Sequence, residues 1–281
     1  MVKEGSFRYR GHRVAYEVHG EGERVLVLVH GLLMNRRMYD ALAPEMAARG
    51  FRVVLVDLLG HGESDKPEDM RIYSMSSFAK QLAGLIEHLE LRSPVVGGTS
   101  LGANVSLELA VHHPGAAGGL FVEMPVLEDA LLGAVLIFTP MLLGLRIGKP
   151  VLGPLSSALR RVPRTHYLVD IFLDWLRRDP LASRGVMEGI LFAGAAPPPE
   201  ERREITLPAL VIGHPADPLH PFSDADMLAG ELTGAQLVNA NSILEWRLTP
   251  SRLNDELAAF LDDFYADRDG IAGRPARSAA S

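Results

Sequence analysis

Short, wholly apolar runs alternate along the chain with longer segments whose apolar residues recur at helical spacing. Five runs are typical of strands buried on both faces of a parallel sheet, and they occupy residues 25–29, 53–56, 94–97, 119–122 and 209–213. Between them lie amphipathic segments such as residues 76–89, with Phe78, Leu82, Leu85 and Leu89 on one face. This alternation predicts an α/β fold, a doubly wound and mostly parallel sheet with helices on both faces.

The two ends of the chain complete this pattern. Residues 7–10 and 13–19 alternate polar and apolar side chains around Gly11, which predicts an antiparallel hairpin at a sheet edge. Toward the C-terminus we expect a helix over 224–232, a strand over 235–239 and a final helix over 250–265.

Strand-like runs stop near Met124 and resume only at Ala209. The intervening sequence has helical periodicity, with prolines at intervals. We therefore predict a core formed by residues 1–124 and 205–266, an inserted helical cap over 125–204 and a disordered tail over 267–281. The segment 131–143 is apolar almost throughout, and most of its side chains are expected to pack the cap onto the sheet. The alternative is that a partner or a membrane surface covers this face.

Composition excludes several classes of protein. The 281 residues include no cysteine, which removes disulfides, thiolate metal sites and cysteine nucleophiles. The formal net charge of −7 gives no electrostatic footprint for nucleic acid. No apolar run follows the N-terminal residues, and the stretch 130–145 is short and contains Pro140. We therefore expect a cytoplasmic protein without an integral membrane segment.

The most specific motif is Gly98-Thr99-Ser100-Leu101-Gly102, which follows a predicted strand and opens a predicted helix. This is the G-x-S-x-G pattern of a nucleophile elbow in the strand–turn–helix context that the pattern requires. Such a turn raises the serine hydroxyl above the sheet edge, and its tightness requires small residues on both sides. Ser100 is therefore the candidate nucleophile.

Three further segments follow predicted strands, at the sheet edge where sites of open α/β folds form. His30-Gly31-Leu32-Leu33 offers backbone amides that, with that of Leu101, suit an oxyanion hole, and His30 is expected to be structural. Asp57 and His61 of the segment 57–64 are expected to fix a glycine-shaped loop. Asp217 is placed where a carboxylate orients a histidine.

These four segments, in this order, resemble the α/β-hydrolase superfamily of capped serine hydrolases, over about residues 7–265. The resemblance implies Ser100 as nucleophile, the amides of Leu32 and Leu101 as oxyanion hole and Asp217 as triad acid. It also implies that the inserted block shapes a substrate pocket.

The chain departs from this family at the catalytic histidine, which the family carries between the last strand and the last helix. Residues 238–250 contain none, and Ile243 stands about where it is expected. Three explanations remain open at this stage. First, the base has moved: His220 is the leading candidate, and Asp217 or the alternative acid Glu123 orients it. His214 is a weaker candidate for the base and is expected instead to cap its strand at the surface. Second, Ser100 serves a non-hydrolytic, lyase- or isomerase-like reaction. Third, the protein is a ligand-binding pseudoenzyme.

Other chemistry is not indicated. No G-x-G-x-x-G follows a strand and no H-E-x-x-H is present, so neither a cofactor nor a metal is expected. The apolar cap favours a small apolar acyl or ester substrate. Glu245 and Arg247 are expected to contribute a structural ion pair that holds the last helix on the core.

Overall fold

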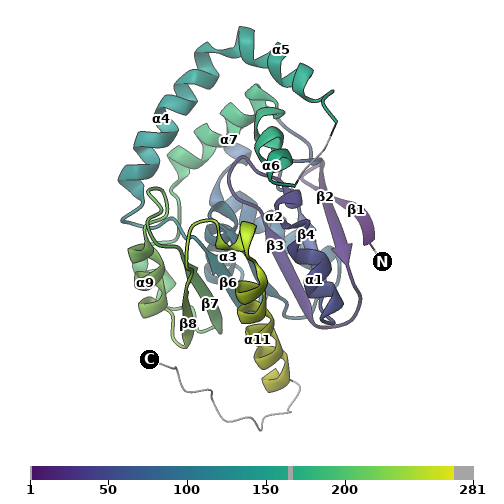
Figure 1. Ribbon diagram of the computed structural model, residues 1–281, viewed down its shortest axis with the longest axis vertical. Helices are drawn as coiled ribbons and strands as arrows, with labels where there is room; N and C mark the ends of the chain where they lie inside the picture. Colours follow the sequence, from purple (N-terminus) through teal and green to yellow (C-terminus); the bar gives the residue numbers. More distant parts are fainter. Residues whose placement is uncertain (1, 164–166, 269–281) are drawn as a thin grey trace.

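The computed structural model describes residues 2–163 and 167–268, which form one eight-stranded sheet flanked by helices (Figure 1). The strands are β1 (Val2–Tyr9), β2 (His12–His19), β3 (Val25–Val29), β4 (Arg52–Val56), β5 (Val95–Thr99), β6 (Gly119–Glu123), β7 (Ala209–Gly213) and β8 (Ala235–Asn239). The core α-helices are α1 (Leu42–Ala48), α2 (Met75–His88), α3 (Leu101–His112), α9 (Phe222–Glu231), α10 (Glu245–Leu248) and α11 (Ser251–Arg268). Of the predicted tail, Asp267 and Arg268 complete α11, and the rest lies outside the described residues.

The sheet has the predicted architecture. Its strand order is β1-β2-β4-β3-β5-β6-β7-β8, and β4 through β8 run parallel. The predicted hairpin is β1 and β2, which pair antiparallel at one edge of the sheet. Parallel strands place their carboxyl ends at a common edge, and the loops that follow β3, β4, β5 and β7 therefore meet there.

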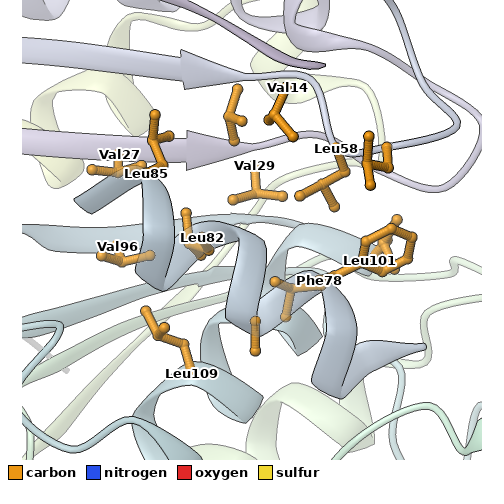
Figure 2. Close-up of a cluster of buried hydrophobic side chains, with 14 of the residues drawn as sticks. Val14, Val27, Val29, Leu58, Phe78, Leu82, Leu85, Val96, Leu101 and Leu109 are labelled. Carbon is orange, nitrogen blue, oxygen red and sulfur yellow. The ribbon is translucent and has the colours of Figure 1, made fainter. Parts of the chain in front are cut away.

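The central strands are buried on both faces, as their unbroken apolar sequence predicts. Val27 and Val29 point to the face covered by α2 and α3, where they join Phe78, Leu82 and Leu101 (Figure 2). The alternate residues of β3 point to the opposite face, covered by α1 and α11. Between β3 and β4 the chain forms a 3-10 turn (Arg36–Tyr39) followed by α1.

Within the described parts of the chain, the regular elements between β6 and β7 are all helices. These are α4 (Leu131–Ile147), α5 (Lys149–Leu159), α6 (Tyr167–Leu176), α7 (Pro180–Ala193) and α8 (Pro199–Arg202). In Figure 1, α4 and α5 form an outer arch, and α7 lies between that arch and the sheet.

The expectation that most of the apolar side chains of α4 pack the cap onto the sheet is wrong. Leu142 is buried and Phe138 and Met141 pack on the core, but Leu132 and Leu136 are 70% and 65% exposed. The outer arch has nothing beyond it in the described protein, so the outward face of α4 remains uncovered. No single described helix is long and apolar enough to cross a membrane, although α4 and Val151–Leu159 of α5, bent by 97°, together have the length and composition.

Two polar side chains anchor the inserted helices to the core. Asp224 of α9 accepts hydrogen bonds from the amides of Leu127, Asp129 and Ala130 at 2.6–3.2 Å, which satisfies backbone donors ahead of α4. Asn104 of α3 donates to the carbonyls of Val126 and Ala195, both at 2.7 Å, and so clasps the two ends of the insertion.

A structural ion pair does hold the last helix, but of Glu245 and Arg247 only Glu245 contributes to it. Glu245 pairs with Arg252 of α11 at 2.8 Å, whereas Arg247 lies 3.9 Å from Glu123. Since Arg252 lies one helical turn and a loop beyond Glu245, the pair closes the α10–α11 junction directly.

Candidate active site

Ser100 lies at the turn between β5 and α3 in a strained backbone conformation, with φ +56° and ψ −107°. The turn is tight because neighbouring backbones meet: a Cβ at Gly98 or Gly102 would lie 2.0 or 1.9 Å from the carbonyl oxygen of Val29. The Ser100 amide donates to the Glu123 carbonyl at 2.9 Å. The strand–turn–helix geometry predicted for the elbow is therefore present, and it holds the hydroxyl above the sheet edge.

The loop after β7 brings an imidazole to this hydroxyl. His220 Nε2 lies 2.9 Å from Ser100 Oγ, and His220 Nδ1 lies 2.9 Å from Asp217 Oδ2. The other carboxylate oxygen of Asp217 accepts the backbone amides of Leu219 and His220 at 2.8 and 3.0 Å. One carboxylate thus fixes both the turn and the ring, and three side chains form a hydrogen-bonded series that ends on Ser100.

The surroundings of Asp217 keep its carboxylate ionised, so that the His220 ring has a charged partner. Partial burial opposes ionisation of this carboxyl, but the hydrogen bond and charge of His220, with the two backbone amides, outweigh it and lower the pKa of Asp217 to about 2. The carboxylate is therefore ionised throughout the neutral range.

Glu123, the alternative acid, belongs to a different cluster. Its carboxylate accepts the Thr99 hydroxyl and lies 3.2 Å from His214 Nε2. Burial alone would raise the pKa of Glu123, but Arg247, His214 and Thr99 together lower it. The acid in contact with His220 is Asp217.

His214 is not at the surface, contrary to expectation. It is 1% exposed, and its Nδ1 lies 3.0 Å from the carbonyl of Ser242. Burial would lower the pKa of His214, but the contact with Glu123 outweighs this and raises it. This histidine ties β7 to the loop in which the family carries its catalytic base, and Ile243 in that loop is 41% exposed.

The candidate oxyanion amides belong to the turn after β3 and to the start of α3. Leu101 is the first residue of α3, so its N–H has no partner in the helix ladder. The turn at Leu32 is closed by the Met34 amide, which donates to the Gly31 carbonyl at 3.0 Å, and Leu33 has φ +57°. Both amides thus lie in turns at the carboxyl ends of the neighbouring strands β3 and β5.

His30 supports this turn from below, as expected. It accepts the Leu58 amide at Nε2, 3.1 Å away, and Nδ1 lies 2.9 Å from the Gly31 carbonyl. Burial is the main cause that lowers the pKa of His30 to about 4, so the ring is neutral at pH 7.

The loop after β4 is also structural, as expected. The Asp57 carboxylate accepts the amides of Arg36 and Glu63 at 2.8 and 3.0 Å and pairs with the Arg36 guanidinium. His61 Nδ1 lies 3.0 Å from the Leu59 carbonyl.

A largely apolar pocket of about 460 Å³ lies among the inserted helices and reaches the turn after β3 through Leu33. Neither Ser100 nor His220 lines it. Its apolar walls come mostly from α4 and α5, and they include Met141, Leu145, Val151, Leu152 and Leu155.

The pocket also contains a cation that the sequence did not single out. Arg178 donates to the carbonyls of Met34 and Gly60, at 3.1 and 2.7 Å, and so links the insertion to the two loops beneath it. Burial lowers the pKa of Arg178 to about 10. Nothing in the Arg177–Arg178 doublet distinguishes this residue, because its role depends on which loops the insertion covers.

Residues 24–143 match the family described as alpha/beta hydrolase fold. A pyrethroid hydrolase of Sphingobium wenxiniae is 34% identical over 36% of this chain and 36% of its own length. An uncharacterised protein of Mycobacterium tuberculosis is 35% identical over 37% of this chain and 29% of its own length. The chain thus matches less than half the length of these curated relatives.

Solved structures resemble this one over nearly its whole length. The enol-lactonase from Burkholderia xenovorans covers 92% of this chain and 100% of its own, with a TM-score of 0.75 and 21% identity. A hydrolase from Pseudomonas aeruginosa covers 92% of this chain and 98% of its own, with a TM-score of 0.73 and 24% identity. With the strand order, these similarities show that the chain has the α/β-hydrolase fold.

Proposed function

We propose that this chain is a serine hydrolase that cleaves apolar acyl substrates of the carboxylic ester type. The observation that carries the proposal is the series Asp217–His220–Ser100, with 2.9 Å at both contacts of the imidazole. The residues follow the family order of nucleophile, acid and base, but the base comes from the loop after β7 instead of the loop after β8.

In this mechanism His220 acts first as a base. As Ser100 Oγ bonds to the substrate carbonyl carbon, its proton passes to Nε2, and Asp217 stabilises the imidazolium through Nδ1–H. The amides of Leu32 and Leu101 bind the oxygen that becomes negative. Nε2 then gives the proton to the leaving alcohol, and an acyl-enzyme remains. A water attacks this ester, its proton passes to Nε2 and then to Ser100 Oγ, and the acid is released.

The inserted helices act in this proposal as a cap that selects the acyl group. The pocket of about 460 Å³ offers mostly apolar walls and reaches Leu33, next to the proposed oxyanion residue Leu32. Such a surface favours aliphatic or aromatic acyl groups over charged groups or sugars. The names of two relatives, a pyrethroid hydrolase and an enol-lactonase, describe enzymes of hydrolytic type.

The test is covalent labelling by a fluorophosphonate, followed by intact mass, on the wild type, Ser100→Ala and His220→Ala. We expect one label on the wild type, none on Ser100→Ala and a rate at least about 1,000-fold lower on His220→Ala. His112→Ala, which removes an exposed helical histidine, is the matched control and should label like the wild type.

Other outcomes assign other functions. A wild type that is folded but unlabelled would leave a ligand-binding pseudoenzyme or a non-hydrolytic, lyase- or isomerase-like catalyst. Labelling that survives in His220→Ala at the wild-type rate would mean that another group serves as base, and His214→Ala would then be examined.

A further inference from the structure

The arch of α4 and α5 exposes an apolar face that the described residues leave uncovered. Leu132 and Ile147 of α4 are each 70% exposed, and Val151 of α5, which also lines the apolar pocket, is 69% exposed. Leu136 and Leu143 continue this face along α4, because they lie four and eleven residues after Leu132, and Leu131 is exposed at the start of the same helix. We call these six residues the arch face. Contiguous exposed apolar surface of this kind marks an interaction site.

The opposite side of α4 is also apolar, but it is occupied. Ala134 and Leu142 are buried there, and Phe138 packs against the core. A helix that is apolar all round requires an apolar environment on both sides. The fold supplies one of them, and the position of the arch at the rim of the molecule leaves the other open (Figure 1).

Charge identifies the kind of partner. Residues 130–163 contain no acidic residue and four basic ones, Arg146, Lys149, Arg160 and Arg161, of which Arg146 lies 2.7 Å from Glu188 of α7; with −7 for the whole chain, the remainder carries −11. A basic, apolar segment on an acidic protein is complementary to an anionic lipid surface, to which each nearby Lys or Arg adds attraction. A symmetric contact between two copies would instead bring positive arches together.

We propose that the arch face docks on an anionic phospholipid bilayer, with α4 and α5 lying in the interface. The 97° bend between the two helices rules out a single straight span and suits helices that rest on a surface. Leu145 and Leu152 line the apolar pocket from the same two helices. If the proposed hydrolase function holds, an apolar substrate dissolved in the bilayer can reach the pocket without crossing water.

The first test is vesicle flotation of the full-length Ser100→Ala protein, so that binding is measured without turnover. We expect flotation with phosphatidylglycerol/phosphatidylcholine vesicles, much less with phosphatidylcholine alone, and weakening in high salt. Leu136→Glu should lower the partition coefficient about tenfold or more. The control Leu248→Glu alters a residue that is 59% exposed on α10, away from the arch, and should leave it unchanged.

Charge is tested separately. Arg161→Glu should lower the partition coefficient about tenfold, since it changes the local charge by two units at the exposed end of α5. Arg203→Glu makes the same change at a position that is 63% exposed beside α8 and should have little effect.

The depth at which α4 enters the bilayer is tested with a single introduced cysteine, because the chain has none of its own. An environment-sensitive dye on Leu136→Cys should shift to the blue with anionic vesicles, whereas the dye on Leu248→Cys should not. The proposal is overturned if the protein fails to float, or if sedimentation without lipid shows a dimer that Leu136→Glu dissociates. The second result would assign the arch face to another copy of the chain. Since the protein tested lacks the Ser100 hydroxyl, neither result bears on the hydrolase proposal.

Discussion

At the residue scale, His220 reaches Ser100 because Asp217 shapes the turn between them. The carboxylate binds the His220 amide with one oxygen and the His220 ring with the other. Ala216, just before it, has φ +57°, which reverses the chain over the sheet edge. A base three residues beyond its acid is therefore held by a single short turn, and the loop after β8 is free to carry Ile243.

Asp217→Asn tests this dependence. The amide oxygen can still accept the backbone N–H groups, but it no longer stabilises the imidazolium and favours the wrong ring tautomer. We expect kcat for a p-nitrophenyl ester to fall about 10,000-fold with the circular dichroism spectrum unchanged. A loss of less than tenfold would contradict a catalytic role for the Asp217–His220 contact.

Sequence reasoning named Ser100, Asp217 and His220 as candidates, but it could not establish that the His220 ring reaches the Ser100 hydroxyl. Motif and strand context locate Ser100 and Asp217 because both follow apolar runs. The reach of His220 depends on the dihedral angles of residues 214–221, which no periodicity specifies. The same limit applies to Glu123 and His214: their places at the end of β6 and just after β7 were evident from the sequence, but their mutual contact was not.

The lowered pKa of His30 predicts how the stability of the protein depends on pH. Its folded pKa of about 4 lies below the ordinary value of 6.5, so the unfolded chain binds more protons between these values. The contribution to stability is full above about pH 6.5 and is lost as the pH falls through about 4. From this residue alone, we expect the free energy of unfolding to fall by about 2 kcal/mol from pH 7 to pH 5, with a further loss from buried His61.

Urea unfolding of the wild type and His30→Asn at both pH values measures this effect. The variant should be less stable at pH 7, since it disturbs the bonds to Leu58 and Gly31, but its stability should change less with pH. An equal pH dependence in both proteins would show that His30 is not the titrating group.

At the element scale, the elbow depends on contact between three backbones. Gly102→Ala would place a methyl group 1.9 Å from the carbonyl oxygen of Val29, and a backbone atom cannot move aside as a flexible side chain can. We expect a loss of about 1–3 kcal/mol in the free energy of unfolding, together with reduced labelling of Ser100.

Gly230→Ala is the matched control, because a Cβ there meets nothing within 4 Å in α9. It should leave labelling unchanged and raise stability by up to about 1 kcal/mol, the usual difference between alanine and glycine in a helix. Equal stability changes in the two variants would mean that the close approach to Val29 is unimportant.

Elements differ in how well a sequence predicts them. The buried strands were predicted within one or two residues, since a short, wholly apolar run such as Val25–Val29 is typical of a strand buried on both faces. Helix α4 was predicted as a helix but assigned the wrong surroundings. Its apolar residues indicate an apolar environment on both sides of the helix. The sequence does not show whether the rest of the protein or another surface provides that environment.

At the scale of the whole molecule, the proposed chemistry and the proposed specificity come from different parts of the chain. The sheet edge carries Ser100, Asp217 and His220, whereas the apolar pocket belongs mainly to α4 and α5. Arg178 connects the two, because it extends from the inserted helices to the carbonyls of Met34 and Gly60. Substitutions in the insertion should therefore change which acyl group is accepted without removing the nucleophile.

Acyl-chain length tests this division. If the acyl group enters the pocket, kcat/KM should rise about fourfold for each added methylene from acetate to butyrate and beyond. The reason is that burial of one methylene contributes about 0.8 kcal/mol of binding free energy. Leu152→Trp fills part of the pocket and should remove this gain for the longer chains while acetate turnover and fluorophosphonate labelling stay near the wild type. Leu132→Trp adds the same bulk on the outer side of α4 and should keep the wild-type profile. If the preference for long chains survives Leu152→Trp, the acyl group binds elsewhere, and the pocket of the insertion must serve another part of the substrate.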